Sequence, residues 1–122
     1  MTSAIDLVSK LSSFDDTWHP RVIGEANGQY IKLAHCEGAL EWHSHEDQDE
    51  VFLCLAGRLI LEFQDREVTL EPGQLFVVPR GLQHRPRADP KASVLLFEPK
   101  ETLHLGGEGG SREISIQDQF LI

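Results

Sequence analysis

The chain has 122 residues, the size of one domain with a core of its own. Its formal net charge is −9, so it lacks the excess of Lys and Arg with which proteins bind nucleic acids or anionic membrane surfaces. No apolar run approaches the length of a membrane span. We therefore expect a single domain, residues 1–122, that binds neither nucleic acid nor membranes.

The N-terminal residues and the cysteines bear on the cellular compartment. Residues 1–6 contain no basic stretch followed by an apolar run, so we expect no signal peptide. Cys36 and Cys54 both fall in apolar segments, where a free cysteine usually packs as a small hydrophobic residue. Two such cysteines do not indicate a disulfide framework. Together these features predict a cytoplasmic protein.

Hydrophobic periodicity predicts one short helix followed by strands. Apolar side chains in residues 4–11 fall on one broad helical face. Later apolar runs are short and are separated by turn residues. Asn27-Gly28 is a strong hairpin signal because both residues tolerate positive φ, and Ala56-Gly57 predicts a second hairpin. The last clear strand covers residues 93–97. Many short strands broken by Gly and Pro indicate an all-β sandwich or barrel.

The C-terminal residues differ in composition from the rest of the chain. Residues 106–111 read Gly-Gly-Glu-Gly-Gly-Ser, which is typical of a flexible linker. Residues 114–122 contain apolar side chains without a clear period. We therefore expect a flexible C-terminal tail over residues 106–122.

Three histidines and a glutamate occur at a spacing suited to a single metal ion. His43 and His45 are two residues apart, so on a strand both would point to the same face. Glu50 opens the next apolar run, and His84 follows a Pro-Arg-Gly turn at the end of another. Strand pairing would bring three imidazoles and a carboxylate together, a ligand set that suits a divalent transition metal. We therefore expect a metal site.

These residues belong to two motifs that resemble the two signatures of the cupin superfamily. The first motif contains Gly38, His43, His45, Glu50 and Gly57, and the second contains Gly73, Pro79, Gly81 and His84. The resemblance covers residues 29–97 and is strongest to small single-domain bacterial cupins, often labelled phosphomannose-isomerase-like. It implies an antiparallel jelly-roll β-barrel with its core over residues 20–98, preceded here by the short helix.

The resemblance also implies the ligands and the cofactor. It carries over the three histidines and the glutamate as ligands of one divalent ion, which in this family is iron, manganese, nickel, zinc or copper. The remaining histidines lie outside both motifs, and we expect ordinary surface or core residues there. They are His19, His35 and His104.

Several other side chains are candidates for contacting a small molecule inside the barrel. Gln48 would face the pocket if the strand has begun there, and a turn position is the alternative. Arg87 would grip a carboxylate or phosphate, or else belong to a solvated cluster. Tyr30 and Lys32 share a strand face by their spacing. The aromatic candidates for the barrel mouth, whose alternative role is simple core packing, are Phe52, Phe76 and Phe97.

The expected site leaves room for chemistry at the metal. Four protein ligands leave two positions on an octahedral ion, where a small molecule would chelate through a carbonyl and a hydroxyl. This suits isomerase or lyase activity on a sugar- or uronate-like substrate. An iron-dependent dioxygenase and a non-catalytic small-molecule-binding or structural cupin are the alternatives. Because the edge strands of a small barrel invite pairing, we also expect a homodimer with two-fold symmetry.

Overall fold

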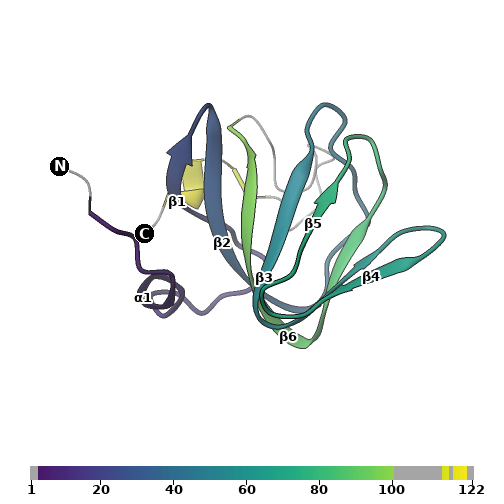
Figure 1. Cartoon of the computed structure of the whole chain (residues 1–122), viewed down its shortest axis with the longest axis horizontal. Coiled ribbons are helices and arrows are strands. Elements are labelled where there is room, and N and C mark those ends of the chain that lie inside the picture. Colours follow the sequence, from purple (N-terminus) through teal and green to yellow (C-terminus); the bar gives the residue numbers. More distant parts are fainter. Residues whose placement is uncertain (1–2, 101–113, 116, 121–122) are drawn as a thin grey trace.

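The computed structural model describes residues 3–100, 114–115 and 117–120 (Figure 1). In this part of the chain a short helix, α1 (Leu7–Leu11), precedes the strands, and a 3₁₀ helix (Gln117–Gln119) follows them. The strands are β1 (Arg21–Ala26), β2 (Gln29–Ala39), β3 (Glu50–Glu62), β4 (Glu67–Leu70), β5 (Leu75–Val78) and β6 (Arg85–Pro99). The predicted all-β fold with a short N-terminal helix is confirmed.

The strands form one antiparallel sheet that curls around a common interior (Figure 1). Its order is β1-β2-β6-β3-β4, and β5 pairs with the first half of β3. The register between β3 and β6 shifts twice, between Cys54 and Ala56 and between Gly57 and Leu59. Such irregularities bend a strand, so β3 can take part in both halves of the curled sheet. The sheet therefore curls as expected of a jelly roll.

Of the two predicted hairpins, the first is confirmed and the second is wrong. β1 and β2 pair around Asn27-Gly28, where both residues have positive φ. Ala56-Gly57 instead lies inside β3, which continues through it as one bent strand. Gly57 has φ +73°, and a Cβ at this position would lie 2.1 Å from the carbonyl oxygen of Lys91 on β6. Glycine is therefore required here for a close approach of two strands.

Apolar side chains that alternate along the strands fill the interior. Phe52 and Cys54 on β3 lie opposite Leu96 and Val94 on β6. These four and Cys36 on β2 belong to one buried core cluster. Both cysteines are free and buried, as the sequence predicts.

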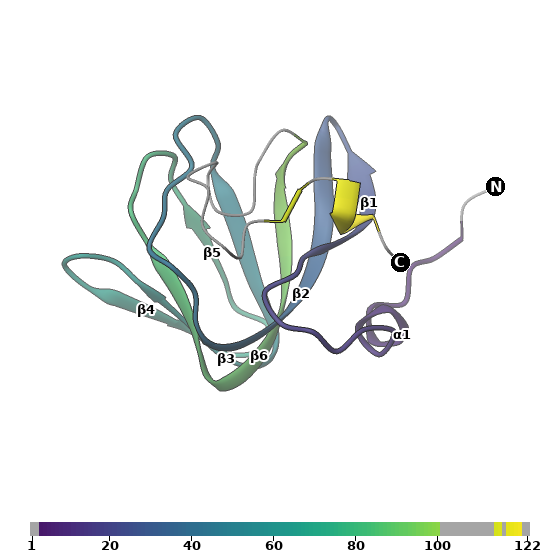
Figure 2. The same ribbon diagram turned by 180° about the vertical axis from the view of Figure 1, so that it is seen from behind.

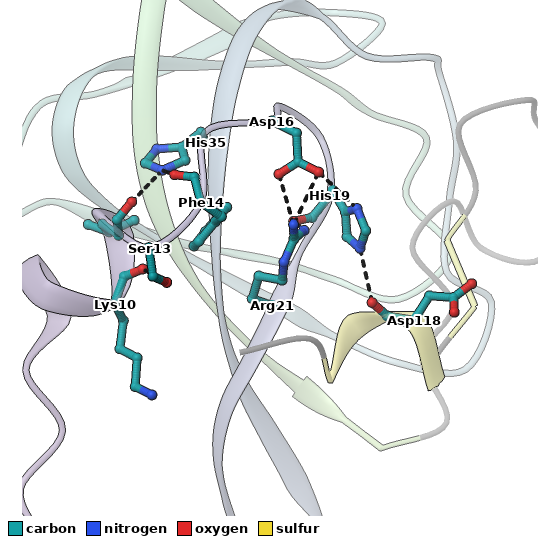
Figure 3. A network of polar contacts seen from close by, with 9 residues as sticks. Lys10, Ser13, Phe14, Asp16, His19, Arg21, His35 and Asp118 are labelled. Atoms are coloured by element: carbon teal, nitrogen blue, oxygen red, sulfur yellow. Dashed lines mark hydrogen bonds and ion pairs between the residues drawn. The ribbon is translucent and has the colours of Figure 1, made fainter.

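The chain between α1 and β1 runs in front of the strands when the molecule is seen from behind (Figure 2). Trp18 in this segment is part of the core, and its Nε1 donates to the carbonyl oxygen of Glu37 at 2.9 Å. His35 on β2 contacts the carbonyl oxygens of Leu11 and Phe14 (Figure 3). The N-terminal segment is thus tied to the sheet by side chains that lie outside the predicted metal site.

The C-terminal residues contact the same region. His19 contacts the carbonyl oxygen of Asp118 at 3.0 Å (Figure 3), and the side chain of Gln119 is fully buried. The expected tail over residues 106–122 lies partly outside the described residues, as does His104. Among the residues that the structure describes, we find no helical segment with the length and hydropathy of a membrane span.

Candidate metal centre

Two connecting segments and the start of one strand bring the four predicted ligands together. His43 and His45 lie between β2 and β3, Glu50 is the first residue of β3, and His84 lies between β5 and β6. Each offers one ligand atom, and these atoms all lie within 4.8 Å of one another. The four side chains are buried, with relative exposures of at most 5%. The cluster is therefore compact enough to hold one ion.

The backbone fixes the rings of His43 and His84. The strand expected at His43 is an extended segment with a single bridge to His84, in which each N–H donates to the other carbonyl at 2.9 Å. Nδ1 of His43 lies 2.9 Å from the carbonyl oxygen of Glu41, and Nδ1 of His84 lies 2.9 Å from that of Leu82. Because a carbonyl only accepts, Nδ1 carries the proton and Nε2 keeps its lone pair. Both rings are thus held in a tautomer that can bind a metal.

The protonation states of His43 and Glu50 also suit metal binding. Burial, and then electrostatic interaction with the neighbouring His84 ring, lowers the pKa of His43 to about 4, so this ring is neutral at pH 7. Burial alone would raise the pKa of Glu50, but polar contacts with His45 and His84 hold that pKa well below its usual range. A neutral imidazole and an ionised carboxylate are the forms in which these residues bind a metal.

A divalent ion would satisfy atoms that the described residues leave poorly paired. Nε2 of His84 is fully buried and lies 3.6 Å from Oε1 of Glu50, beyond normal hydrogen-bond length. A buried nitrogen in this state costs free energy unless another partner is present. Three imidazole nitrogens and one carboxylate oxygen match the preferences of first-row divalent metals. The residues present therefore fit such an ion.

A small cavity of about 30 Å³ adjoins the cluster. His43 and Glu50 form part of its wall, and the rest is largely apolar, including Trp18, Phe52 and Leu96. This volume suits one or two water-sized molecules. A larger hollow of about 430 Å³ lies beside the N-terminal segment and is lined by none of the four candidate ligands. A molecule that reaches the four candidate ligands would therefore occupy the small cavity and not the larger hollow.

Comparison with known proteins identifies the family. The Cupin domain family model matches residues 30–98, which is more than half of the chain. The chain belongs to the cupin family. Protein YdbB of Bacillus subtilis is 35% identical over 80 residues, which are 65% of this chain and 71% of YdbB. The resemblance noted in the two sequence motifs is confirmed.

Two solved structures share both sequence and fold with this cupin. A cupin-2 domain protein from Shewanella frigidimarina is 40% identical, with a TM-score of 0.77 over 78% of this chain and 93% of that one. Protein NMB1881 from Neisseria meningitidis is 30% identical, with a TM-score of 0.73 over 80% of this chain and 99% of that one. The small cupin fold therefore extends over most of the described chain.

The substrate-contact candidates fall in different parts of the cupin. Phe76 pairs with Phe52 across β5 and β3, and Phe76 packs against the core. Phe97 lies opposite Val51, on the other face of the sheet from Phe52. Gln48 lies in the segment before β3 and is half-buried. Phe52 and Phe76 therefore lie on the interior face of the sheet and Phe97 on the other, and a role of these rings at the barrel mouth stays a prediction.

The charged and tyrosine candidates are also separated. Arg87 pairs with Ile60 on the outer face, and it forms ion pairs with Glu62 and Glu67 at 3.0 Å. These ion pairs match the second role considered for Arg87, that of a member of a charged surface cluster. Tyr30 and Lys32 share one face of β2, as expected from their spacing, and Lys32 is fully buried.

Sequence reasoning missed Glu98, which is 2% exposed and contacts the carboxyl group of Glu50. Burial, and then the charge of Glu50, raises the pKa of Glu98 well above its usual range. The available signal was its position two residues after Leu96, which places a carboxyl on the interior face of a strand. Its contact with Glu50 additionally requires the register between β3 and β6.

Proposed function

We propose that this cupin binds one divalent transition-metal ion and uses it to act on a small molecule. The ligands would be His43, His45, Glu50 and His84. The observation that carries the proposal is the convergence of four buried ligand atoms within 4.8 Å, in tautomers that the backbone fixes for two of the rings.

The residues define what the site offers to a substrate. A bound ion would supply a Lewis acid that polarises a carbonyl oxygen. Glu50 contributes the negative charge among the candidate ligands, and the carbonyls of Glu41 and Leu82 keep two imidazoles in place. These features support isomerase or lyase chemistry on a sugar- or uronate-like compound that chelates through neighbouring oxygens. Because the adjoining cavity holds only about 30 Å³, such a substrate requires movement of the side chains that line it.

Specific observations favour each of two other functions. The small, largely apolar cavity has the size of a diatomic molecule, which favours an iron-dependent dioxygenase. The burial of all four candidate ligands favours a non-catalytic cupin, in which the ion binds a small molecule or stabilises the barrel. The size and apolar lining of the cavity thus favour the dioxygenase over the first function, and the burial of the ligands favours the non-catalytic cupin.

Metal analysis followed by two assays tests these functions. We expect the purified chain to bind about one equivalent of a divalent ion, consistent with a single four-ligand site. The metal-loaded protein should then convert a member of a panel of sugars and uronates without consuming oxygen. Oxygen consumption with ferrous iron and a small aromatic compound would instead support the dioxygenase. Stoichiometric metal without turnover would support the non-catalytic function, and a chain that binds no divalent ion contradicts all three.

A further inference from the structure

A buried lysine–glutamate pair lies next to Glu50 and has no part in the function proposed above. Nζ of Lys32 lies 2.8 Å from Oε1 of Glu98, and the two side chains are 0% and 2% exposed. Burying a charged or strongly polar group removes its hydration, and only a partner in good geometry offsets that cost. A buried pair is therefore weak evidence for stability alone, and its position suggests a more specific role.

The strand register places Glu98 between the metal cluster and Lys32. Val51 lies opposite Phe97, so the adjacent interior position of β6 facing Glu50 on β3 is Glu98. On the other side of β6, Leu96 lies opposite Lys32 of β2. Lys32 is thus diagonal to Glu98, at a separation that long side chains can bridge. Three neighbouring strands bring Glu50, Glu98 and Lys32 into one interior row.

Glu98 contacts both of its neighbours in this row. Its buried carboxyl group faces the buried carboxyl group of Glu50 across the register of β3 and β6, and Oε1 of Glu98 lies 2.8 Å from the ammonium group of Lys32. A carboxyl group that is buried between two polar neighbours, as that of Glu98 is, has little rotational freedom. Glu50 is therefore supported on the side away from the histidines by a group that is itself anchored.

We propose that Glu98, anchored by Lys32, is a positioning residue that holds the carboxylate of Glu50 toward the three histidines and thereby sets the affinity for a divalent ion. The proposal rests on the proposed metal binding. Groups that orient metal ligands commonly change metal affinity by about 10- to 100-fold when they are removed. The competing explanation is a charge pair that contributes to folding alone.

The main test compares two variants with different effects on the support of Glu50. Lys32→Met with Glu98→Leu replaces both polar side chains by apolar ones, a change that buried pairs often tolerate without loss of folding. Its affinity for Zn²⁺, measured by chelator competition, should fall by about 10- to 100-fold. Glu98→Gln keeps a donor toward Glu50 and an acceptor toward Lys32, so its affinity should stay within about threefold of wild type.

In Lys32→Met alone, the direction of the change in Zn²⁺ affinity distinguishes an anchoring role of Lys32 from simple electrostatic repulsion. Loss of a positive charge near the site would raise the affinity for a cation if electrostatic repulsion were the only effect. Loss of the anchor of Glu98 should lower the affinity instead. A higher affinity for Zn²⁺ in Lys32→Met overturns the anchoring role.

The visible spectrum of bound Co²⁺ gives a readout of ligand geometry that a purely structural role would not change. It should differ from wild type in the double variant and be restored in Glu98→Gln. Glu62→Gln is the matched control, because Glu62 is also an ion-paired carboxylate of β3 but pairs with Arg85 and Arg87 and with none of the four candidate ligands. Its Zn²⁺ affinity and Co²⁺ spectrum should equal those of wild type.

The outcomes separate this proposal from the function on which it rests. A wild-type chain that binds neither Zn²⁺ nor Co²⁺ overturns both. Normal binding by wild type with equal affinity in the double variant overturns the positioning role and leaves the metal site intact. A loss in Glu98→Gln as large as that in the double variant, or an equal loss in Glu62→Gln, also overturns it.

Discussion

His45 and His84 come from different connecting segments but approach the same oxygen. Their Nε2 atoms lie 3.2 and 3.6 Å from Oε1 of Glu50. A single ion bound among these atoms would depend on both rings. Because the apolar core lies largely outside this cluster, removing the rings should leave the barrel folded.

We therefore expect His45→Ala with His84→Ala to abolish stoichiometric metal binding while the protein remains folded. Metal content after dialysis and the circular dichroism spectrum measure the two effects. His19→Ala is the control because His19 lies in the N-terminal segment, and it should keep a full equivalent of metal. A full equivalent in the double variant would show that the ligand assignment is wrong.

The buried, neutral state of His43 predicts how stability depends on pH. The pKa of His43 is lowered to about 4 from the 6.5 expected in the unfolded chain. The unfolded chain therefore takes up this proton more readily, and the contribution of His43 to stability is lost as pH falls from 6.5 toward 4. The shift corresponds to at most ~3 kcal/mol.

Urea unfolding of the metal-free protein at several pH values measures this contribution. Glu98 opposes it, because a raised carboxyl pKa gives stability at low pH that is lost as pH rises. The comparison of wild type with His43→Gln isolates His43, and the variant should lose less stability between pH 6.5 and 4.5. Identical slopes for both proteins would contradict a neutral buried His43.

Residue type and the two motifs were enough to predict the four candidate ligands, and not enough to predict Glu98. His43 and His45 share a direction by their spacing, and the motif connects them with His84. Glu98 comes close to the candidate ligands only because β3 pairs with β6. These two strands are separated by more than twenty residues in the sequence. A local pattern does not contain that register. The contact between Glu98 and Glu50 therefore could not be predicted from the sequence alone.

At the scale of elements, the long strands were the part of the fold hardest to predict. β6 extends from Arg85 to Pro99, whereas the sequence predicted a strand over residues 93–97. Pro86 and Pro90 interrupt the pattern, and proline usually argues against a strand interior. Gly57 similarly indicated a turn, because positive φ is common to turns and to bends within a strand. Glycine and proline therefore indicated where the backbone is irregular, but not whether the irregularity is a turn or a bend within a strand.

The close approach of β3 and β6 at Gly57 predicts a strong effect of one added methyl group. Gly57→Ala would combine an unfavourable positive φ with a Cβ placed 2.1 Å from the carbonyl oxygen of Lys91. We expect a loss of at least ~2 kcal/mol in the free energy of unfolding. Gly73→Ala is the matched control, because Gly73 has φ +89° but no atom within 4 Å of the added Cβ.

The control should lose about 1 kcal/mol, the cost of the backbone conformation alone. Chemical denaturation of the three proteins under the same conditions measures both values. Equal losses in the two variants would show that crowding against Lys91 has no effect. The pair of variants thus tests why β3 needs glycine at the bend.

At the scale of the whole molecule, the outer face of the sheet is apolar where β5, β3 and β6 lie side by side. The register aligns two rows across these strands. One row contains Leu75, Leu53 and Leu95, and the other contains Val77, Val51 and Phe97. Leu75 is 58% exposed and Val77 is 47% exposed. An apolar face of this kind, next to the edge of a sheet, favours association with another molecule.

We predict that this face forms the two-fold interface of a homodimer, since a two-fold axis lets the same apolar rows meet each other. Leu75→Glu with Val77→Glu should convert the dimer to a monomer by placing charges in the interface. Light scattering at micromolar concentration measures the mass of wild type and variant. Trp42→Glu is the control, because Trp42 is also exposed but packs against Arg85 near the opposite half of the sheet. A monomeric wild type would contradict the homodimer, and a dimeric variant would place its interface elsewhere.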